Sequence, residues 1–226
     1  MIVLVHAGIG DATMWDGLDL PDATRHEIRG FGRTPMPATG TVSNVDDLVE
    51  TLGGEPAALV GASYGGWVCL QLAVARPELV TDLILLGAPL PDHEWSEEIE
   101  QVRREEERLV EGEGDLQAGA VLMADFWLES AEPRERVIEM QKRAYEMQLG
   151  SEAEIDEPDS IDLSKITART LVGVGELDKR DFHEIAERLA REIPQAQSVV
   201  IPGAGHVTAL DRPEATASVI CRFLSI

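Results

Sequence analysis

The chain has 226 residues, 44% of them hydrophobic, and a formal net charge of −23. This size allows one large core, and the negative charge argues against nucleic acids and anionic membranes as partners, because both present phosphate groups. No run approaches the roughly 20 apolar residues of a membrane span. The two cysteines, Cys69 and Cys221, have no metal-ligand spacing and are expected to be buried thiols in a reducing compartment. We therefore expect a cytoplasmic protein.

Strands and helices are expected to alternate along the chain. The apolar start, residues 1–6, is too short for a signal peptide and predicts a strand. Further strands are expected near 25–28, 56–61, 82–87, 169–174 and 197–201, and helices over 44–53, 64–76 and 182–193. A last helix is predicted to open in a capping-box-like start at Asp211. This alternation indicates a mostly parallel sheet with helices on both faces.

The most informative motif is G-A-S-Y-G at residues 61–65. The spacing Gly-x-Ser-x-Gly between a strand and a helix predicts a serine, Ser63, in a strained and exposed turn. Its hydroxyl would point into a cleft above a helix N-terminus, where negative charge is favoured. The glycines are needed because strand and helix pass too closely for a Cβ. The alternative interpretation is an ordinary N-capping serine.

Two later motifs supply partners for this serine. Residues 203–206, G-A-G-H, follow a predicted strand and deliver His206, which can take a serine proton near neutral pH and return it to a leaving group. A carboxylate would hold the imidazole in the required tautomer. The acids that could do so are Asp92, Glu176, Asp178 and Asp181. The remaining histidines, His26, His93 and His183, have no motif around them and are interpreted as surface residues.

With H-A-G-I-G at 6–10, these motifs resemble the α/β-hydrolase superfamily, in which the order is Ser, Asp or Glu, then His. The resemblance frames nearly the whole chain and favours Asp178, which ends a G-x-x-D pattern. It implies an oxyanion hole built from the backbone N–H groups of Tyr64 and Gly8, with Ile9 as the neighbouring alternative to Gly8. Ala7 stands where the family usually has glycine, and His6 is expected to brace this loop. Because residues 1–6 resemble the third strand of the family, the N-terminal strands are expected to be truncated.

Residues 90–160 carry no family motif. They are helix-prone and acidic, and we expect them to form a helical cap inserted into a core of residues 1–89 and 161–226. Five apolar side chains are candidates for the substrate pocket: Ile9, Trp67, Trp95, Phe126 and Trp127. A mostly apolar pocket under such a cap would suit a small uncharged or weakly polar ester.

The resemblance implies a serine hydrolase that uses no metal or cofactor and works through an acyl-enzyme. Carboxylesterase is the default activity, and similarity to the enol-lactone hydrolase branch makes a lactonase or a carbon–carbon bond hydrolase the alternatives. Ser63 argues against haloalkane dehalogenases and epoxide hydrolases, which use Asp at this position. A ligand receptor or regulatory protein that retains the triad is the alternative of a different class, and acyl transfer is a third. The expected partner is a small ester or lactone, and the expected state is a monomer or homodimer.

Overall fold

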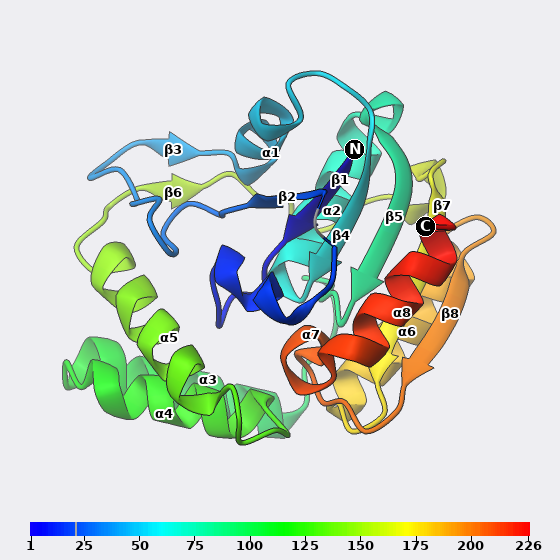
Figure 1. Cartoon of the computed structure of the whole chain (residues 1–226). Coiled ribbons are helices and arrows are strands. Elements are labelled where there is room, and N and C mark those ends of the chain that lie inside the picture. Colours follow the sequence, from blue (N-terminus) through cyan, green and yellow to red (C-terminus); the bar gives the residue numbers. More distant parts are fainter. Residues whose placement is uncertain (21) are drawn as a thin grey trace.

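A computed structural model describes residues 1–20 and 22–226. Its main element is a six-stranded sheet in the order β2-β1-β4-β5-β7-β8, with every neighbouring pair parallel (Figure 1). The strands are β1 (Ile2–Val5), β2 (Ala23–His26), β4 (Ala57–Ala62), β5 (Val80–Leu86), β7 (Arg169–Gly175) and β8 (Gln197–Ile201). Each lies within a few residues of a strand expected from the sequence, so the predicted parallel sheet is confirmed.

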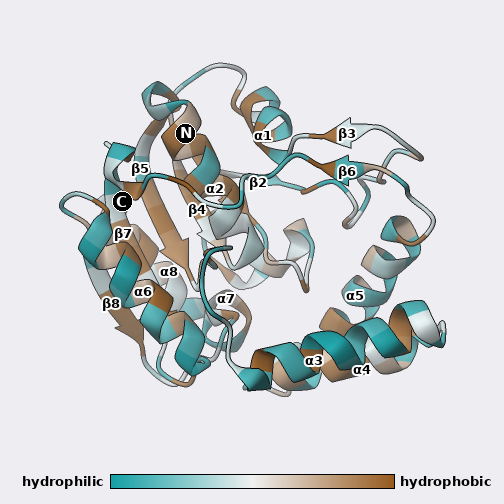
Figure 2. Cartoon of the chain, turned by 180° about the vertical axis from the view of Figure 1, so that it is seen from behind, coloured by the Kyte–Doolittle hydropathy of each residue, from teal (hydrophilic) through white to brown (hydrophobic). Residues whose placement is uncertain are grey.

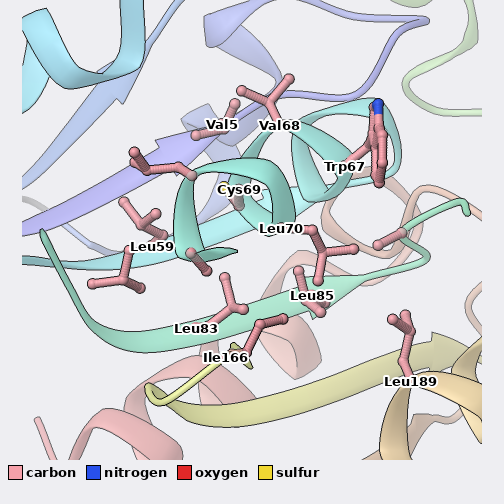
Figure 3. Packing of buried hydrophobic residues seen from close by; sticks show 14 of the residues in the cluster. Val5, Leu59, Trp67, Val68, Cys69, Leu70, Leu83, Leu85, Ile166 and Leu189 are labelled. Carbon is pink, nitrogen blue, oxygen red and sulfur yellow. The ribbon is translucent and has the colours of Figure 1, made fainter. Parts of the chain in front are cut away.

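Side chains alternate across this sheet and divide the apolar interior into two layers. Leu83 and Leu85 of β5 pack on one face, whereas Ile84 and Leu86 pack on the other. The first face is covered by α1 (Asn44–Leu52), α2 (Tyr64–Ala75) and α6 (Arg180–Glu192), and the second by η1 (Ala12–Gly17), α7 (Thr208–Asp211) and α8 (Pro213–Leu224). Figure 3 shows the first layer, with α2 packed directly on β4 and β5. Burial on both faces is the reason that β4 and residues 83–86 of β5 are apolar without interruption.

The last helix begins differently from the prediction. Its N-cap is Arg212, whose side chain caps nothing, and Pro213 occupies the first turn. Asp211 instead ends α7, and its buried carboxylate accepts hydrogen bonds from backbone N–H groups of Gly205 (2.9 Å), Glu129 (3.1 Å) and Ser130 (2.8 Å). The predicted capping box is therefore wrong, because tertiary contacts take the carboxylate that a box would use.

Between β5 and β7 the chain leaves the sheet. It forms α3 (Glu97–Glu107), a π-helical turn (Arg108–Gly112), α4 (Leu116–Trp127) and α5 (Arg134–Gln148), which lie together to one side of the sheet (Figure 1). Strand β6 (Glu154–Ile155) then pairs in parallel with β3 (Thr41–Val42). We propose that residues 90–160 act as the cap. Figure 2 shows long hydrophilic stretches on α3, whereas β5 and β8 are largely hydrophobic.

Two further sequence expectations concern the cysteines and the membrane. Cys69 is fully buried in α2, and burial raises the pKa of its thiol. Cys221 is only half-buried, so the expected burial is wrong for that residue, which packs at the edge of the core that α8 covers. Among the helices of the described residues, none is long and apolar enough to cross a membrane.

Candidate active site

The turn between β4 and α2 holds Ser63 in the conformation predicted for it. Ser63 has φ 47° and ψ −119°, a backbone region that non-glycine residues rarely adopt and that is associated with functional sites. The turn also needs glycine on both sides. A Cβ added to Gly61 would lie 2.6 Å from the Cα of Gly66, and one added to Gly65 would collide with the backbone of β1. The close passage of strand and helix inferred from the motif is therefore present.

Ser63, His206 and Asp178 form one hydrogen-bonded row. The Nε2 atom of His206 lies 2.8 Å from the Ser63 Oγ, and its Nδ1 lies 3.1 Å from both carboxylate oxygens of Asp178. The Asp178 side chain has no exposed surface and that of His206 is 5% exposed. The backbone N–H of Lys179 donates to Asp178 at 2.7 Å and fixes the carboxylate. This arrangement can deliver a proton from the serine to the imidazole and hold the resulting charge.

The other candidate acids are engaged elsewhere. Asp92 pairs with both terminal nitrogens of Arg188 at 2.8 and 2.9 Å. Asp181 accepts from the backbone N–H of Ser96 at 2.7 Å, and Glu176 accepts from that of Gly203 at 2.8 Å. Of the four acids left open by the sequence, only Asp178 contacts His206.

The histidines outside this row do not all lie where the sequence suggested. His6 is buried and accepts from the N–H of Ile28 at 3.0 Å, so it braces the loop after β1 as expected. His26 is buried rather than on the surface, and its Nδ1 lies 2.8 Å from the Thr51 hydroxyl. His93 and His183 are both half-buried, and the Nε2 of His93 lies 3.2 Å from Asp181. Packing between β2 and α1 buries His26, and no sequence motif reports that contact.

The two residues expected to form the oxyanion hole, Gly8 and Tyr64, are neighbours in the structure. A Cβ added to Gly8 would be 3.5 Å from the Cβ of Tyr64. Tyr64 is the first residue of α2, so its N–H has no carbonyl in a preceding helical turn. Its phenol donates to Glu157 at 2.5 Å and accepts from Asn44 at 2.8 Å, and burial, with the hydrogen bond to Glu157, raises its pKa.

A cavity of about 410 Å³ opens above Ser63 and His206. Three of the five predicted pocket residues, Ile9, Trp95 and Trp127, line it. The Trp127 ring lies 4.4 Å from the His206 ring, centroid to centroid, and so packs directly against the proposed base.

Two pocket predictions are wrong. Trp67 is 2% exposed and belongs to the core beneath α2, where Figure 3 shows it among apolar side chains. Every residue of α2 from Gly65 to Ala73 is buried, so an aromatic residue there has no need to face a pocket. Phe126 lies outside the cavity lining, against Trp127 and under the Lys179 ammonium at 4.2 Å. Neighbouring helix positions point about 100° apart, so only Trp127 of this pair reaches the cavity.

The polar side chains that line this cavity were not predicted from the sequence. The proposed cap contributes the polar lining residues Arg103, Glu106, Gln141, Tyr145 and Gln148. The Tyr145 hydroxyl donates to Glu106 at 2.5 Å, and burial raises the pKa of both groups. The expectation of a mostly apolar pocket is therefore wrong, because the proposed cap adds these polar side chains to the apolar Trp95 and Trp127. Glu106 lies in a run of charges that resembles a solvated helix face, and nothing in that pattern marks the residue that turns inward.

Comparison with known proteins gives the family. The model of the alpha/beta hydrolase family matches residues 2–219. The chain belongs to this family. A solved thermophilic esterase from Thermogutta terrifontis, with malate bound, is similar over 99% of this chain and 89% of its own, with 29% identity and a TM-score of 0.78. The expected fold and the expected class of α/β-hydrolase enzyme are thereby confirmed.

Curated relatives show the same likeness at lower identity or over shorter stretches. A pimeloyl-[acyl-carrier protein] methyl ester esterase of Pectobacterium atrosepticum is 25% identical over 98% of this chain and 93% of its own length. Lipase LipV of Mycobacterium tuberculosis is 33% identical over 38% of this chain. That match spans 36% of the lipase, and similar local matches span 28% of three uncharacterised mycobacterial proteins. Within the described residues, no group of three or more His, Cys, Asp or Glu side chains is arranged to hold a metal ion.

Proposed function

We propose that this chain is a carboxylesterase that cleaves a small ester through a Ser63–His206–Asp178 triad. The observation that carries this proposal is the hydrogen-bonded row of 2.8 Å and 3.1 Å contacts at the end of the sheet. The 29% identity to an esterase over almost the whole chain supports the reaction class.

Each residue of the row has one task in the proposed mechanism. His206 takes the proton of Ser63 as its oxygen attacks the ester carbonyl, and the tetrahedral oxyanion accepts hydrogen bonds from the N–H groups of Tyr64 and Gly8. His206 then gives the proton to the leaving alcohol, and an acyl-enzyme remains. Water, deprotonated by His206, attacks the acyl-enzyme and releases the acid. Asp178 holds the imidazole in one tautomer and stabilises its charged form.

The cavity above Ser63 sets the substrate class. Ile9, Trp95 and Trp127 contribute apolar surface to the cavity, and α3 and α5 contribute polar side chains. Among these, the Arg103 guanidinium lies 4.5 Å over the Trp95 ring. A substrate with a short apolar part and a hydrogen-bonding group satisfies both kinds of side chain. At about 410 Å³ the cavity suits a small ester or lactone rather than a long lipid chain.

The test is hydrolysis of p-nitrophenyl esters of increasing acyl length, by the wild-type protein and by Ser63→Ala. We expect turnover by the wild type, an optimum at short acyl chains, and loss of turnover in Ser63→Ala without change in circular dichroism. Equal turnover by both proteins would contradict the proposal. Absence of turnover together with labelling of Ser63 by a fluorophosphonate would favour lactone or carbon–carbon substrates, and absence of both would favour a receptor.

A further inference from the structure

A second cavity lies between α5 and the core, away from Ser63. Its volume is about 490 Å³, and it shares no lining residue with the cavity above Ser63. Its walls come from residues 11–13, from Arg25 and Glu27, from Gly32 and Arg33, and from one face of α5. The α5 residues are Arg136, Glu139, Met140 and Arg143.

This cavity is unusual because several of the arginines that line it form no ion pair. Across the described residues, the arginines that form no ion pair are Arg33, Arg136, Arg143, Arg212 and Arg222. The first three line this one cavity. The chain has 42 acidic and only 19 basic residues, so carboxylates to pair with them are abundant. Arg33, Arg136 and Arg143 nevertheless form no ion pair, although Asp11, Glu27 and Glu139 line the same cavity.

The acids of the cavity accept hydrogen bonds from other groups. Asp11 accepts from the backbone and the hydroxyl of Thr13 at 2.9 and 2.6 Å. Glu27 accepts from the backbone N–H of Arg33 at 2.8 Å, and Glu139 pairs with Lys142 at 3.4 Å. The guanidinium donors therefore remain available, apart from one bond from Arg136 to the carbonyl of Thr13 at 3.3 Å.

We propose that this cavity binds a small molecule with two or more phosphate or carboxylate groups. The planar fork of arginine matches the paired oxygens of either group. Met140 and Ala12 add apolar surface against which a carbon skeleton can lie. The overall charge of −23 repels anions in general, so an anion held here requires this local concentration of arginine.

Helix α5 connects this site to the cavity above Ser63. Arg136, Met140 and Arg143 lie on one face of α5, and Gln141, Tyr145 and Gln148 lie on the opposite face and line the cavity above Ser63. Because both faces belong to one helix, an anion that holds the first face of α5 in place also holds the side chains of the second. Bound anion is therefore expected to change the KM of the hydrolase, a consequence that rests on the proposed function.

The test is isothermal titration of the protein with pyrophosphate and with citrate at constant ionic strength. We expect saturable binding of at least one probe, and the tighter one identifies phosphate or carboxylate as the natural group. Arg136→Gln and Arg143→Gln are each expected to weaken binding roughly tenfold or more. Arg222→Gln is the matched control, because Arg222 is also exposed and unpaired but lies on α8, outside the cavity.

Two results would overturn the site: no saturable binding of either probe, or the same loss of affinity in Arg222→Gln as in Arg143→Gln. Binding is measured without turnover, and Ser63→Ala is expected to bind the probe as the wild type does. A failure of the proposed hydrolysis is therefore distinguishable from a failure of the anion site. With both intact, a saturating probe should shift KM in the wild type and leave KM unchanged in Arg143→Gln.

Discussion

Asp92 and Asp178 both follow strands of the central sheet, and their surroundings separate their roles. Replacement of Asp178 by Asn removes the charge that orients His206, and we expect a roughly 10³- to 10⁴-fold loss in kcat. Asp92→Asn breaks only an exposed pair with Arg188, so its kcat should stay within about twofold of wild type. The measurement is kcat for the best p-nitrophenyl ester. A large loss of kcat in Asp92→Asn together with an unchanged kcat in Asp178→Asn would mean that Asp92, and not Asp178, orients His206.

His26 gives a prediction about pH and stability. Burial lowers its pKa from 6.5 to about 4, so the folded protein holds it neutral while the unfolded chain protonates it near 6.5. Stability is therefore complete above pH 6.5 and falls as the pH drops from 6.5 towards 4. At pH 5 the loss from this group is about 2 kcal/mol. Urea unfolding at pH 7.5 and 5.0 should show a smaller acid loss in His26→Gln, and an equal loss would contradict the burial argument.

Single residues were predictable from the sequence where a local motif fixed them. Ser63 and His206 lie in short glycine-bounded turns, and the backbone of those turns decides where the side chains point. The pocket predictions for Trp67 and Phe126 were wrong because helical periodicity shows which side chains share a face of the helix but not what that face packs against. The predicted surface position of His26 was wrong because the burial of this side chain depends on α1, which is distant in the sequence.

At the end of α4, the adjacent residues Phe126 and Trp127 lie in different surroundings. Trp127 lines the cavity above Ser63 and Phe126 does not. Trp127→Ala should therefore widen the cavity, move the acyl-length optimum to longer chains and lower kcat for short esters. Phe126→Ala is the control and should leave the optimum unchanged. The measurement is kcat/KM across the ester series, and a shift in Phe126→Ala alone would show that the side chains exchange places in solution.

Asp211 joins two parts of the chain that no sequence pattern connects. Its carboxylate holds the N–H of Gly205, next to His206, and those of Glu129 and Ser130 after α4. Asp211→Asn presents an amide to one of these donors and leaves it unsatisfied, so we expect a loss of about 1–3 kcal/mol and a lower kcat. Asp125→Asn, an exposed acid on α4, is the control. The measurements are the free energy of unfolding in urea and kcat. Equal losses in Asp211→Asn and Asp125→Asn would contradict a special role for the Asp211 hydrogen bonds.

Elements with several turns or strand residues were predictable, because their apolar pattern extends over many positions. β3 and β6 were not, since two residues cannot display a period of two. The π-helical turn after α3 was also missed, because it continues a helical pattern without a break in composition.

The whole molecule carries more negative charge than its ion pairs offset. With a net charge of −23, like charges repel one another in the folded state, and added salt screens that repulsion. We expect the Tm to rise between 0.05 M and 0.5 M NaCl at pH 7.5. Thermal unfolding followed by circular dichroism measures this, with sucrose of equal osmolality as the control. A fall in Tm with salt would mean that surface ion pairs outweigh the repulsion.

The pairing of β6 with β3 bears on how this protein can be recombined with its relatives. A chimera that exchanges all of residues 90–160 would discard β6, and with it the strand pairing with β3. It would also discard Glu157, which accepts a hydrogen bond from the Tyr64 hydroxyl. The host would then lose a contact on Tyr64, the residue that follows the proposed nucleophile. A junction placed just before Glu154 keeps that segment with the host, and libraries of exchanged caps should be cut there.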